Sequence, residues 1–259
     1  MNDAAKQWAI ESQSRKAAEF VSHYQALRED PYSDGFSYGR MRLDSVLRNY
    51  LPENGDGLRL LDVGCGTGHH LSDLRARGYE IAGIDASPEM LEHARSNNPG
   101  ADIRLADVEQ LPFADASFDF VLCVEVLRYL PDPDPTIREL ARVLKPGGRV
   151  LAIAAPLFNL QGYSLLNRLV LVLPLRGFTR LPQFFETERR VRSRFERAGF
   201  GDIRVHGVSF GPVTWVGRLL PNSLRSFLKC WEPIDRKLAD RPRTRELANM
   251  FLVSAIRPA

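Results

Sequence analysis

Short apolar runs alternate with helical patterns over residues 58–210. The runs predict strands, and the segments between them carry apolar residues three or four positions apart, which predicts helices. The predicted strands are 60–63, 81–85, 101–107, 118–123, 149–154 and 203–210, with a last one at 249–256, and the predicted helices include 69–77, 135–144 and 187–198. This alternation favours an α/β fold, in which helices cover both faces of a parallel sheet.

The chain outside this pattern is less regular. Polar segments with a helical spacing of apolar residues occupy 3–29 and 40–50, and a Pro-containing turn follows at 51–55. We divide the chain into a helical segment and a larger domain with two insertions: 1–52, then 53–259, with insertions at about 155–186 and 211–246. The first insertion holds the longest apolar run, 169–175, which is too short to span a bilayer.

Composition restricts the class of protein but does not define its function. The 44% hydrophobic and 26% charged content is ordinary for a globular domain, and a net charge of +3 is too small to argue for nucleic acid. The three cysteines, at 65, 123 and 230, have neither metal-site nor disulfide spacing. The first residues contain no apolar signal-peptide region. We therefore expect a cytoplasmic protein.

One stretch carries the chemistry, the sequence Leu-Leu-Asp-Val-Gly-Cys-Gly-Thr-Gly-His-His at 60–70. A buried strand leads into a turn with glycines at 64, 66 and 68, and the turn leads into a helix. Glycines allow a ligand to lie against main-chain N–H groups at a helix N-terminus, which predicts a nucleotide-cofactor site. A dinucleotide fingerprint would place its third glycine where His69 stands, so the spacing opposes a nicotinamide cofactor. An ordinary glycine-rich turn remains the alternative.

The same stretch resembles the first motif of the class I S-adenosylmethionine (SAM) methyltransferases. The resemblance continues through Asp-Ala-Ser-Pro-Glu-Met at 85–90, Leu-Pro-Phe and Ser-Phe-Asp within 111–119, and Lys-Pro-Gly-Gly at 145–148. It rests on specific motifs over about 58–156 and on pattern alone over 187–259. It implies a Rossmann-like, seven-stranded sheet of order 3-2-1-4-5-7-6, whose last strand is antiparallel. It also implies that 1–52 caps the cofactor pocket, although a helical pair closing the sheet edge fits this segment equally well.

Three successive predicted strands end in an acid. Asp85 lies about 20 residues beyond the glycine turn, where a carboxylate can accept hydrogen bonds from both ribose hydroxyls. The resemblance implies that Asp107 and the N–H of Val108 face the adenine and that Met90 packs beside it. A helix cap at Asp85 and a solvated loop at Asp107 are the alternatives. The cofactor-binding residues that we predict are Asp62, Gly64, Cys65, Gly66, Asp85, Ala86, Met90, Asp107, Val108, Glu125 and Arg42.

Two members of this set would serve the methionyl end of SAM. Glu125 follows the fourth strand, so its carboxylate or carbonyl could bind near the sulfonium and the amine; a glutamate without ligand contact is the alternative. Arg42 resembles an arginine that clamps the SAM carboxylate in relatives, and a solvated helix arginine is again the alternative.

The acceptor side departs from the ubiquinone-pathway O-methyltransferases. Those enzymes show valine-leucine-glutamate-histidine after the fourth strand, within a pattern that supplies metal ligands, whereas Arg128 and Tyr129 stand here, so we expect no metal. Tyr129 and His23 are candidates for orienting or deprotonating the acceptor, and packing or surface roles are the alternatives. His69 and His70 are adjacent and cannot share one helix face, so we expect them to line the cofactor turn or to meet solvent.

These observations predict a SAM-dependent methyltransferase with a small-molecule acceptor. We expect transfer to a hydroxyl oxygen of a natural-product, lipid or quinone-like molecule, and the arginine-rich insertions suggest a hydrophobic or anionic acceptor or contact with a membrane surface. No Asn/Asp-Pro-Pro-Tyr/Phe motif follows the fourth strand, which disfavours nucleic-acid bases. A SAM-fold binding protein without turnover, acting as a partner subunit, is the alternative.

Overall fold

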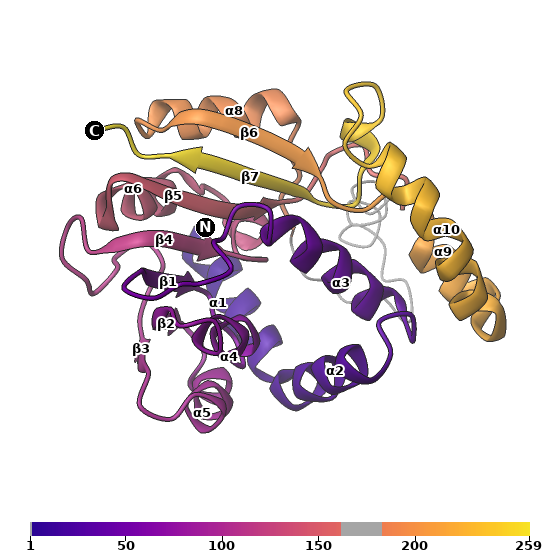
Figure 1. The fold of residues 1–259 in the computed structure, drawn as a ribbon, viewed down its shortest axis with the longest axis horizontal. Helices are drawn as coiled ribbons and strands as arrows, with labels where there is room; N and C mark the ends of the chain where they lie inside the picture. Colours follow the sequence, from indigo (N-terminus) through magenta and orange to yellow (C-terminus); the bar gives the residue numbers. More distant parts are fainter. Residues whose placement is uncertain (1, 162–182) are drawn as a thin grey trace.

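The computed structural model describes residues 2–161 and 183–259, and the apolar run at 169–175 lies outside them. Seven strands form one sheet of order β3-β2-β1-β4-β5-β7-β6, which confirms the predicted fold class and strand order (Figure 1). The strands are β1 Arg59–Val63, β2 Glu80–Asp85, β3 Asp102–Leu105, β4 Phe118–Cys123, β5 Leu144–Ala154, β6 Gly201–Gly207 and β7 Phe251–Ile256. Strands β1 to β5 pair in parallel, and β7 is antiparallel to both of its neighbours.

Helices cover both faces of this sheet. They are α1 Asn2–Ser14, α2 Ala17–Glu29, α3 Gly35–Leu47, α4 His69–Arg75, α5 Pro88–Asn97, α6 Asp134–Val143, α8 Glu188–Arg197, α9 Val213–Leu219 and α10 Leu224–Leu238. Successive strand residues serve opposite faces, because side chains alternate along a strand. Leu61 of β1 joins the core with α6 and α8, whereas Leu60 joins the core with α3 and α4.

Local chemistry explains several helix starts. The Ser87 side chain accepts a hydrogen bond from Met90 N at 3.1 Å, and Pro88 occupies the first turn, so these two residues set the start of α5. The helix predicted at 40–50 begins earlier, at Gly35, because the Asp34 carboxylate accepts from Ser37 N at 2.8 Å.

Two sequence predictions are wrong in detail. The single helix predicted at 3–29 is two helices, α1 and α2, since the chain leaves the helical path at residues 15–16, where Lys16 N donates to Gln13 O at 2.9 Å. The Lys-Pro-Gly-Gly segment is not a turn ahead of the fifth strand. The fifth strand, predicted at 149–154, therefore begins earlier, at Leu144, and the segment is an irregularity inside it, where Phe118 pairs with Leu144 but Phe120 pairs with Arg149.

Polar contacts attach the C-terminal additions to the rest of the fold. Asp235 of α10 is fully buried and accepts hydrogen bonds from Tyr38, from Arg42 Nε at 2.9 Å and from Phe210 N at 2.8 Å. This carboxylate therefore joins α10 to α3, which lie near each other in Figure 1.

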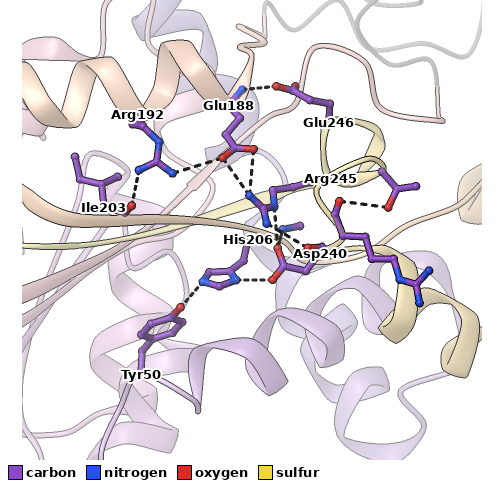
Figure 2. A network of polar contacts seen from close by, with 11 residues as sticks. Tyr50, Glu188, Arg192, Ile203, His206, Asp240, Arg245 and Glu246 are labelled. Carbon is purple, nitrogen blue, oxygen red and sulfur yellow. Dashed lines mark hydrogen bonds and ion pairs between the residues drawn. The ribbon is translucent and has the colours of Figure 1, made fainter.

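A second network, shown in Figure 2, lies at the β6 edge. His206 of β6 contacts Tyr50, and its Nδ1 lies 2.7 Å from an Asp240 oxygen. Arg245 then bridges Asp240, at 3.0 Å, and Glu188 of α8, at 3.1 Å. Among the residues that the structure describes, no helix has the length and apolar content needed to cross a membrane.

Candidate active site

A cavity of about 670 Å³ opens beyond the carboxyl ends of β1, β2 and β4. In an open parallel sheet ligands bind at this edge, because the connections that leave neighbouring strands at the switch point go to opposite faces and open a crevice between them. Its floor is formed by the segments that follow these strands, 64–67, 85–87 and 124–126, and helices α1, α2 and α3 contribute the opposite wall. Of the predicted cofactor residues, the lining includes Asp62, Gly64, Cys65, Gly66, Asp85, Ala86, Met90, Val108 and Glu125.

The glycine turn meets two different steric demands. Gly64, Gly66 and Gly68 have φ values of +76°, +53° and +80°, which side chains rarely adopt. A Cβ on Gly64 would lie 2.2 Å from Val126 Cγ2, so this glycine is needed for packing. A Cβ on Gly66 would meet nothing within 4 Å, so open space faces the main chain there. Gly66 is therefore where a ligand can approach the backbone.

Asp85, at the end of β2, is held against this turn. One carboxylate oxygen accepts from Gly66 N at 2.8 Å and the other accepts from Ser87 N at 2.9 Å. Burial raises the pKa of Asp85, and these backbone hydrogen bonds oppose the rise. The predicted acid and the predicted turn thus meet at one side of the cavity.

Asp62, inside β1, is the most unusual polar group of the cavity. It is 1% exposed, and neither carboxylate oxygen has a hydrogen-bond partner among the described residues. Burial, and then the charge of Asp85, raise its pKa to about 7. A buried carboxylate without a partner carries a large desolvation penalty, so a ligand that donates hydrogen bonds or carries positive charge would stabilise it.

Arg40, rather than Arg42, is the α3 arginine on the cavity wall. Its Nη1 is buried without a partner among the described residues. Burial lowers its pKa, but the Tyr24, Glu125 and Asp44 side chains raise it above the usual value, so the guanidinium stays charged. Arg42 instead pairs with Asp235 and is not among the described residues that line the cavity.

The comparisons with known proteins agree with this geometry. Residues 61–152 match the family model described as a methyltransferase domain. This stretch is similar to a methyltransferase domain. A malonyl-[acyl-carrier protein] O-methyltransferase of Erwinia pyrifoliae is 44% identical over 97 residues, which are 38% of this chain and 37% of that protein. A ubiquinone biosynthesis O-methyltransferase of Xanthomonas oryzae is 40% identical over 99 residues, which are 36% of this chain and 41% of that protein.

These matches are confined to part of each protein. The chain spans about two fifths or less of the length of the curated relatives it matches. Solved structures resemble nearly the whole fold. A Thermotoga maritima protein described as a SAM-dependent methyltransferase, possible histamine N-methyltransferase, has a TM-score of 0.62 at 20% identity, covering 94% of this chain and 97% of that one. At such identity the likeness extends to the fold alone.

Glu125 follows β4, within the residues that match the methyltransferase-domain model, and has a backbone conformation unusual for a residue with a side chain. Its φ is +62°, and its carboxylate accepts from Arg128 Nη1 at 2.6 Å. Burial alone would raise the pKa of Glu125, but the charges of Arg128 and Arg40 lower it by more. The pKa is therefore below its usual value, and the carboxylate is charged in the cavity. Strained backbone of this kind persists where the surrounding structure holds it, and it is common at binding sites.

Asp107 lies beside the domain's cavity and is not among its described lining residues, whereas the next residue, Val108, is. Lys6 Nζ, from α1, lies 2.6 and 2.7 Å from its carboxylate oxygens and 3.2 Å from Glu109 Oε2. Burial raises the pKa of Asp107, while the Glu109 N–H and the Lys6 ammonium lower it, and the lowering is larger. The proposed adenine-facing acid is therefore in contact with the first helix.

The two predicted catalytic residues have different positions. Tyr129 lines the cavity, and burial raises the pKa of its phenol, so the hydroxyl stays protonated at neutral pH. His23 is not among the described lining residues; its ring packs 4.9 Å from the Phe36 ring, and Phe36 does line the cavity.

The sequence left open whether His69 and His70 line the cofactor turn or meet solvent, and it missed the contact of His69 with Tyr24. Both line the cavity, and the His69 ring stacks on Tyr24 at a centroid distance of 4.0 Å. Burial lowers the pKa of each histidine to about 4, so both imidazoles are neutral at pH 7. The position after the third glycine is what indicated contact with the turn, whereas Tyr24 comes from a helix whose placement depends on tertiary packing. Within the described residues, no group of three or more His, Cys, Asp or Glu side chains is arranged to hold a metal ion.

Proposed function

We propose that this chain is a SAM-dependent methyltransferase that transfers a methyl group to a small-molecule acceptor. The observation that carries the proposal is the pairing of Asp85 with Gly66 N at the mouth of the glycine turn, directly beside open space. An acid in this position, within a methyltransferase domain, is suited to accept hydrogen bonds from a ribose diol.

The unpaired groups of the cavity fit the remaining parts of SAM. Asp62 would take the methionyl amine, which supplies the donors that its two oxygens lack. Arg40 would take the methionyl carboxylate, in the role that the sequence suggested for Arg42. Met90 and Val108 would flank the adenine. When bound, SAM supplies a methyl group on a positively charged sulfur; the protein's part is to bind, orient and exclude water.

We further propose a hydroxyl oxygen as the acceptor, on a natural-product, lipid or quinone-like molecule. The cavity beyond the proposed cofactor residues offers neutral hydrogen-bonding groups, among them the Tyr129 hydroxyl and the His69 imidazole. The neutral imidazole can accept a hydrogen bond from the acceptor hydroxyl, and the protonated phenol can donate a hydrogen bond that orients the acceptor oxygen. The relatives named as O-methyltransferases support transfer to oxygen.

Calorimetric titration of the full chain with S-adenosylhomocysteine tests the proposal. We expect saturable binding with one site per chain, and absence of binding at millimolar ligand would contradict it. The acceptor is tested separately, by transfer of labelled methyl from SAM to matched phenols and anilines. Faster labelling of the anilines would contradict the assignment to oxygen and leave the cofactor site standing.

A further inference from the structure

The end of α9 presents large apolar side chains to solvent. Trp215, Leu219 and Leu220 are 39%, 75% and 58% exposed, and Leu219 is the most exposed large apolar residue of the described chain. Isolated exposed leucines are common on protein surfaces, but adjacent ones often mark an interaction site. Trp215 and Leu219 stand four positions apart and so share one helix face.

This face is the one that α9 does not use for packing. Val213 is 3% exposed and lies against α3, where its Cγ1 would meet a Cβ on Gly35 at 3.2 Å. Gly217 faces Leu224 of α10 in the same way, at 3.2 Å. The apolar residues on the outer face therefore have no role in the core. Trp215 is fixed in place by its Nε1, which donates to Gln161 O at 2.9 Å.

The surrounding charge is of one sign along the chain. Residues 203–231 contain no acidic residue and four basic ones, Arg204, Arg218, Arg225 and Lys229. Arg218 lies between Trp215 and Leu219, and Arg225 lies in the first turn of α10, five positions after Leu220. Asp30 of the neighbouring loop pairs with Arg225 at 2.8 Å, yet the Arg225 side chain remains 63% exposed. We refer to Trp215, Leu219, Leu220 and Arg225 as the α9 tip.

The α9 tip is also close to the cavity. Arg218, one position before Leu219, lines the cavity, although the leucines point to solvent. In Figure 1, α9 and α10 extend at the end of the molecule opposite β3. A surface that contacts the tip would therefore be next to the cavity rim and far from the β3 edge.

We propose that the α9 tip docks the protein on an anionic membrane surface, with the two leucines and the tryptophan at the boundary between headgroups and acyl chains. Leu and Trp flanked by Lys and Arg are the side chains that enter this boundary and contact anionic headgroups. A protein partner is less suited, because a specific interface covers about 800 Å² on each side and three apolar side chains on a projecting helix end fall short of that. The docking needs no helix that crosses the bilayer.

The docking also names a class of acceptor, and this part rests on the proposed function. A cavity whose rim lies beside a docked helix is accessible to an amphipathic molecule held in the lipid. We therefore infer that the acceptor is membrane-soluble, with its hydroxyl on a polar head.

Flotation of the full chain with vesicles tests the docking without any measurement of methyl transfer. One set of vesicles contains phosphatidylcholine alone, and the other contains about 30% phosphatidylglycerol, enough to make the surface strongly anionic. We expect binding to the anionic set that weakens at high salt, because salt screens the headgroup charge. The double variant Leu219→Ser/Leu220→Ser should lower the partition coefficient about tenfold or more, since each leucine side chain contributes strongly to burial.

Matched controls separate the tip from general surface effects. Leu105→Ser removes an exposed leucine at the β3 edge, and Arg189→Gln removes an exposed charge on α8; both should bind like the unmodified chain. Circular dichroism establishes that each variant is folded. The proposal is overturned if Leu105→Ser lowers the partition coefficient as much as the double leucine variant, or if the chain binds neutral and anionic vesicles equally. It is also overturned if the chain binds no vesicles, including the case in which it binds only a soluble acidic polypeptide. Any of these results leaves S-adenosylhomocysteine binding, and hence the proposed function, unaffected.

Discussion

At the scale of single residues, the cavity is built around carboxylates in different states. Asp85 has its hydrogen bonds supplied by the backbone, whereas Asp62 has none among the described residues. A group that the protein leaves unpaired is destabilising until a ligand arrives, so part of the binding free energy for SAM would come from relieving it. The two acids should therefore respond differently to substitution and to pH.

Replacement of Asp85 is predicted to weaken binding of the cofactor product. Asp85→Ala removes two hydrogen bonds from the proposed ribose hydroxyls to a charged acceptor, each contributing about 1.5–3 kcal/mol, so we expect a loss of roughly 3–6 kcal/mol. Calorimetry with S-adenosylhomocysteine measures it. Glu92→Ala, which removes an exposed acid on α5, serves as the control. An unchanged dissociation constant in Asp85→Ala would show that this carboxylate does not contact the ligand.

Binding is also predicted to depend on pH through Asp62. Its pKa of about 7 means that below neutrality an amine must displace a proton from the carboxylate. Affinity for S-adenosylhomocysteine should therefore increase as the pH rises toward 7, by at most about tenfold per pH unit, and then level off. Asp62→Asn should bind weakly and lose this dependence. Asp44 is a second acid with a raised pKa, about 6. The variant Asp44→Asn should still show the increase of affinity with pH that occurs above pH 6.

The raised pKa of Asp62 has the opposite effect on stability: the free energy of unfolding should decrease as the pH rises. The folded chain holds the Asp62 proton up to about pH 7, whereas the unfolded chain releases it near pH 4. Because the folded state binds more protons over this window, the contribution of Asp62 to the free energy of unfolding falls as pH rises from 4 to 7. Urea titrations should show a smaller fall in Asp62→Asn. A fall of equal size would assign the pH dependence to other groups.

At the scale of elements, the strand–turn–helix unit at 59–75 contains one glycine that a ligand can approach and another that the packing of the fold requires. Gly66 faces open space, and Gly64 faces Val126. The same type of substitution should therefore have different consequences two residues apart.

Gly66→Val is predicted to abolish S-adenosylhomocysteine binding in a folded protein, because its side chain would fill the space beside Asp85. Gly57→Val is the matched control: Gly57 also has a positive φ, +74°, and a Cβ there would meet nothing within 4 Å. Both variants carry a backbone penalty of about 1–3 kcal/mol, but only the first should lose binding. Gly64→Ala should instead lower the melting temperature more than either. Equal binding of S-adenosylhomocysteine by the two valine variants would show that the glycine turn does not contact the ligand.

The half of the site that the sequence predicted well is the half encoded locally. Glycines at 64 and 66 and an acid at the end of β2 are set by turn and strand chemistry, so their positions follow from spacing. The other wall comes from α1 to α3, and its register on the sheet depends on packing between distant segments. No local sequence feature distinguishes Arg40 from Arg42. Asp235, almost two hundred positions later, forms an ion pair with Arg42, whereas Arg40 lines the cavity.

At the scale of the whole molecule, buried polar contacts make the additions part of one structure. Asp235 joins α10 to α3, and α3 supplies Arg40 to the cavity. Disruption of α10 should therefore affect both stability and the site.

Asp235→Ala is predicted to destabilise the fold by about 3–5 kcal/mol, since it leaves the Arg42 charge buried without its partner. Urea unfolding monitored by circular dichroism measures the change. Arg236→Ala, at the neighbouring position, removes a 56% exposed side chain from its ion pair with Glu232 and should cost about 1 kcal/mol or less. If the alanine variant does not fold, Asp235→Asn provides the measurement. Equal costs at the two positions would contradict a structural role for the buried pair.

The contact between Lys6 and Asp107 has a practical consequence for how this protein is handled. The first helix forms one wall of the cavity, so a purification tag or reporter fused ahead of it would be attached to the ligand's own surroundings. A ligand screen on such a fusion, or on a variant that lacks the first helix, would therefore test a cavity with a different wall. Attachment after β7, where the last residues are exposed, keeps that wall intact.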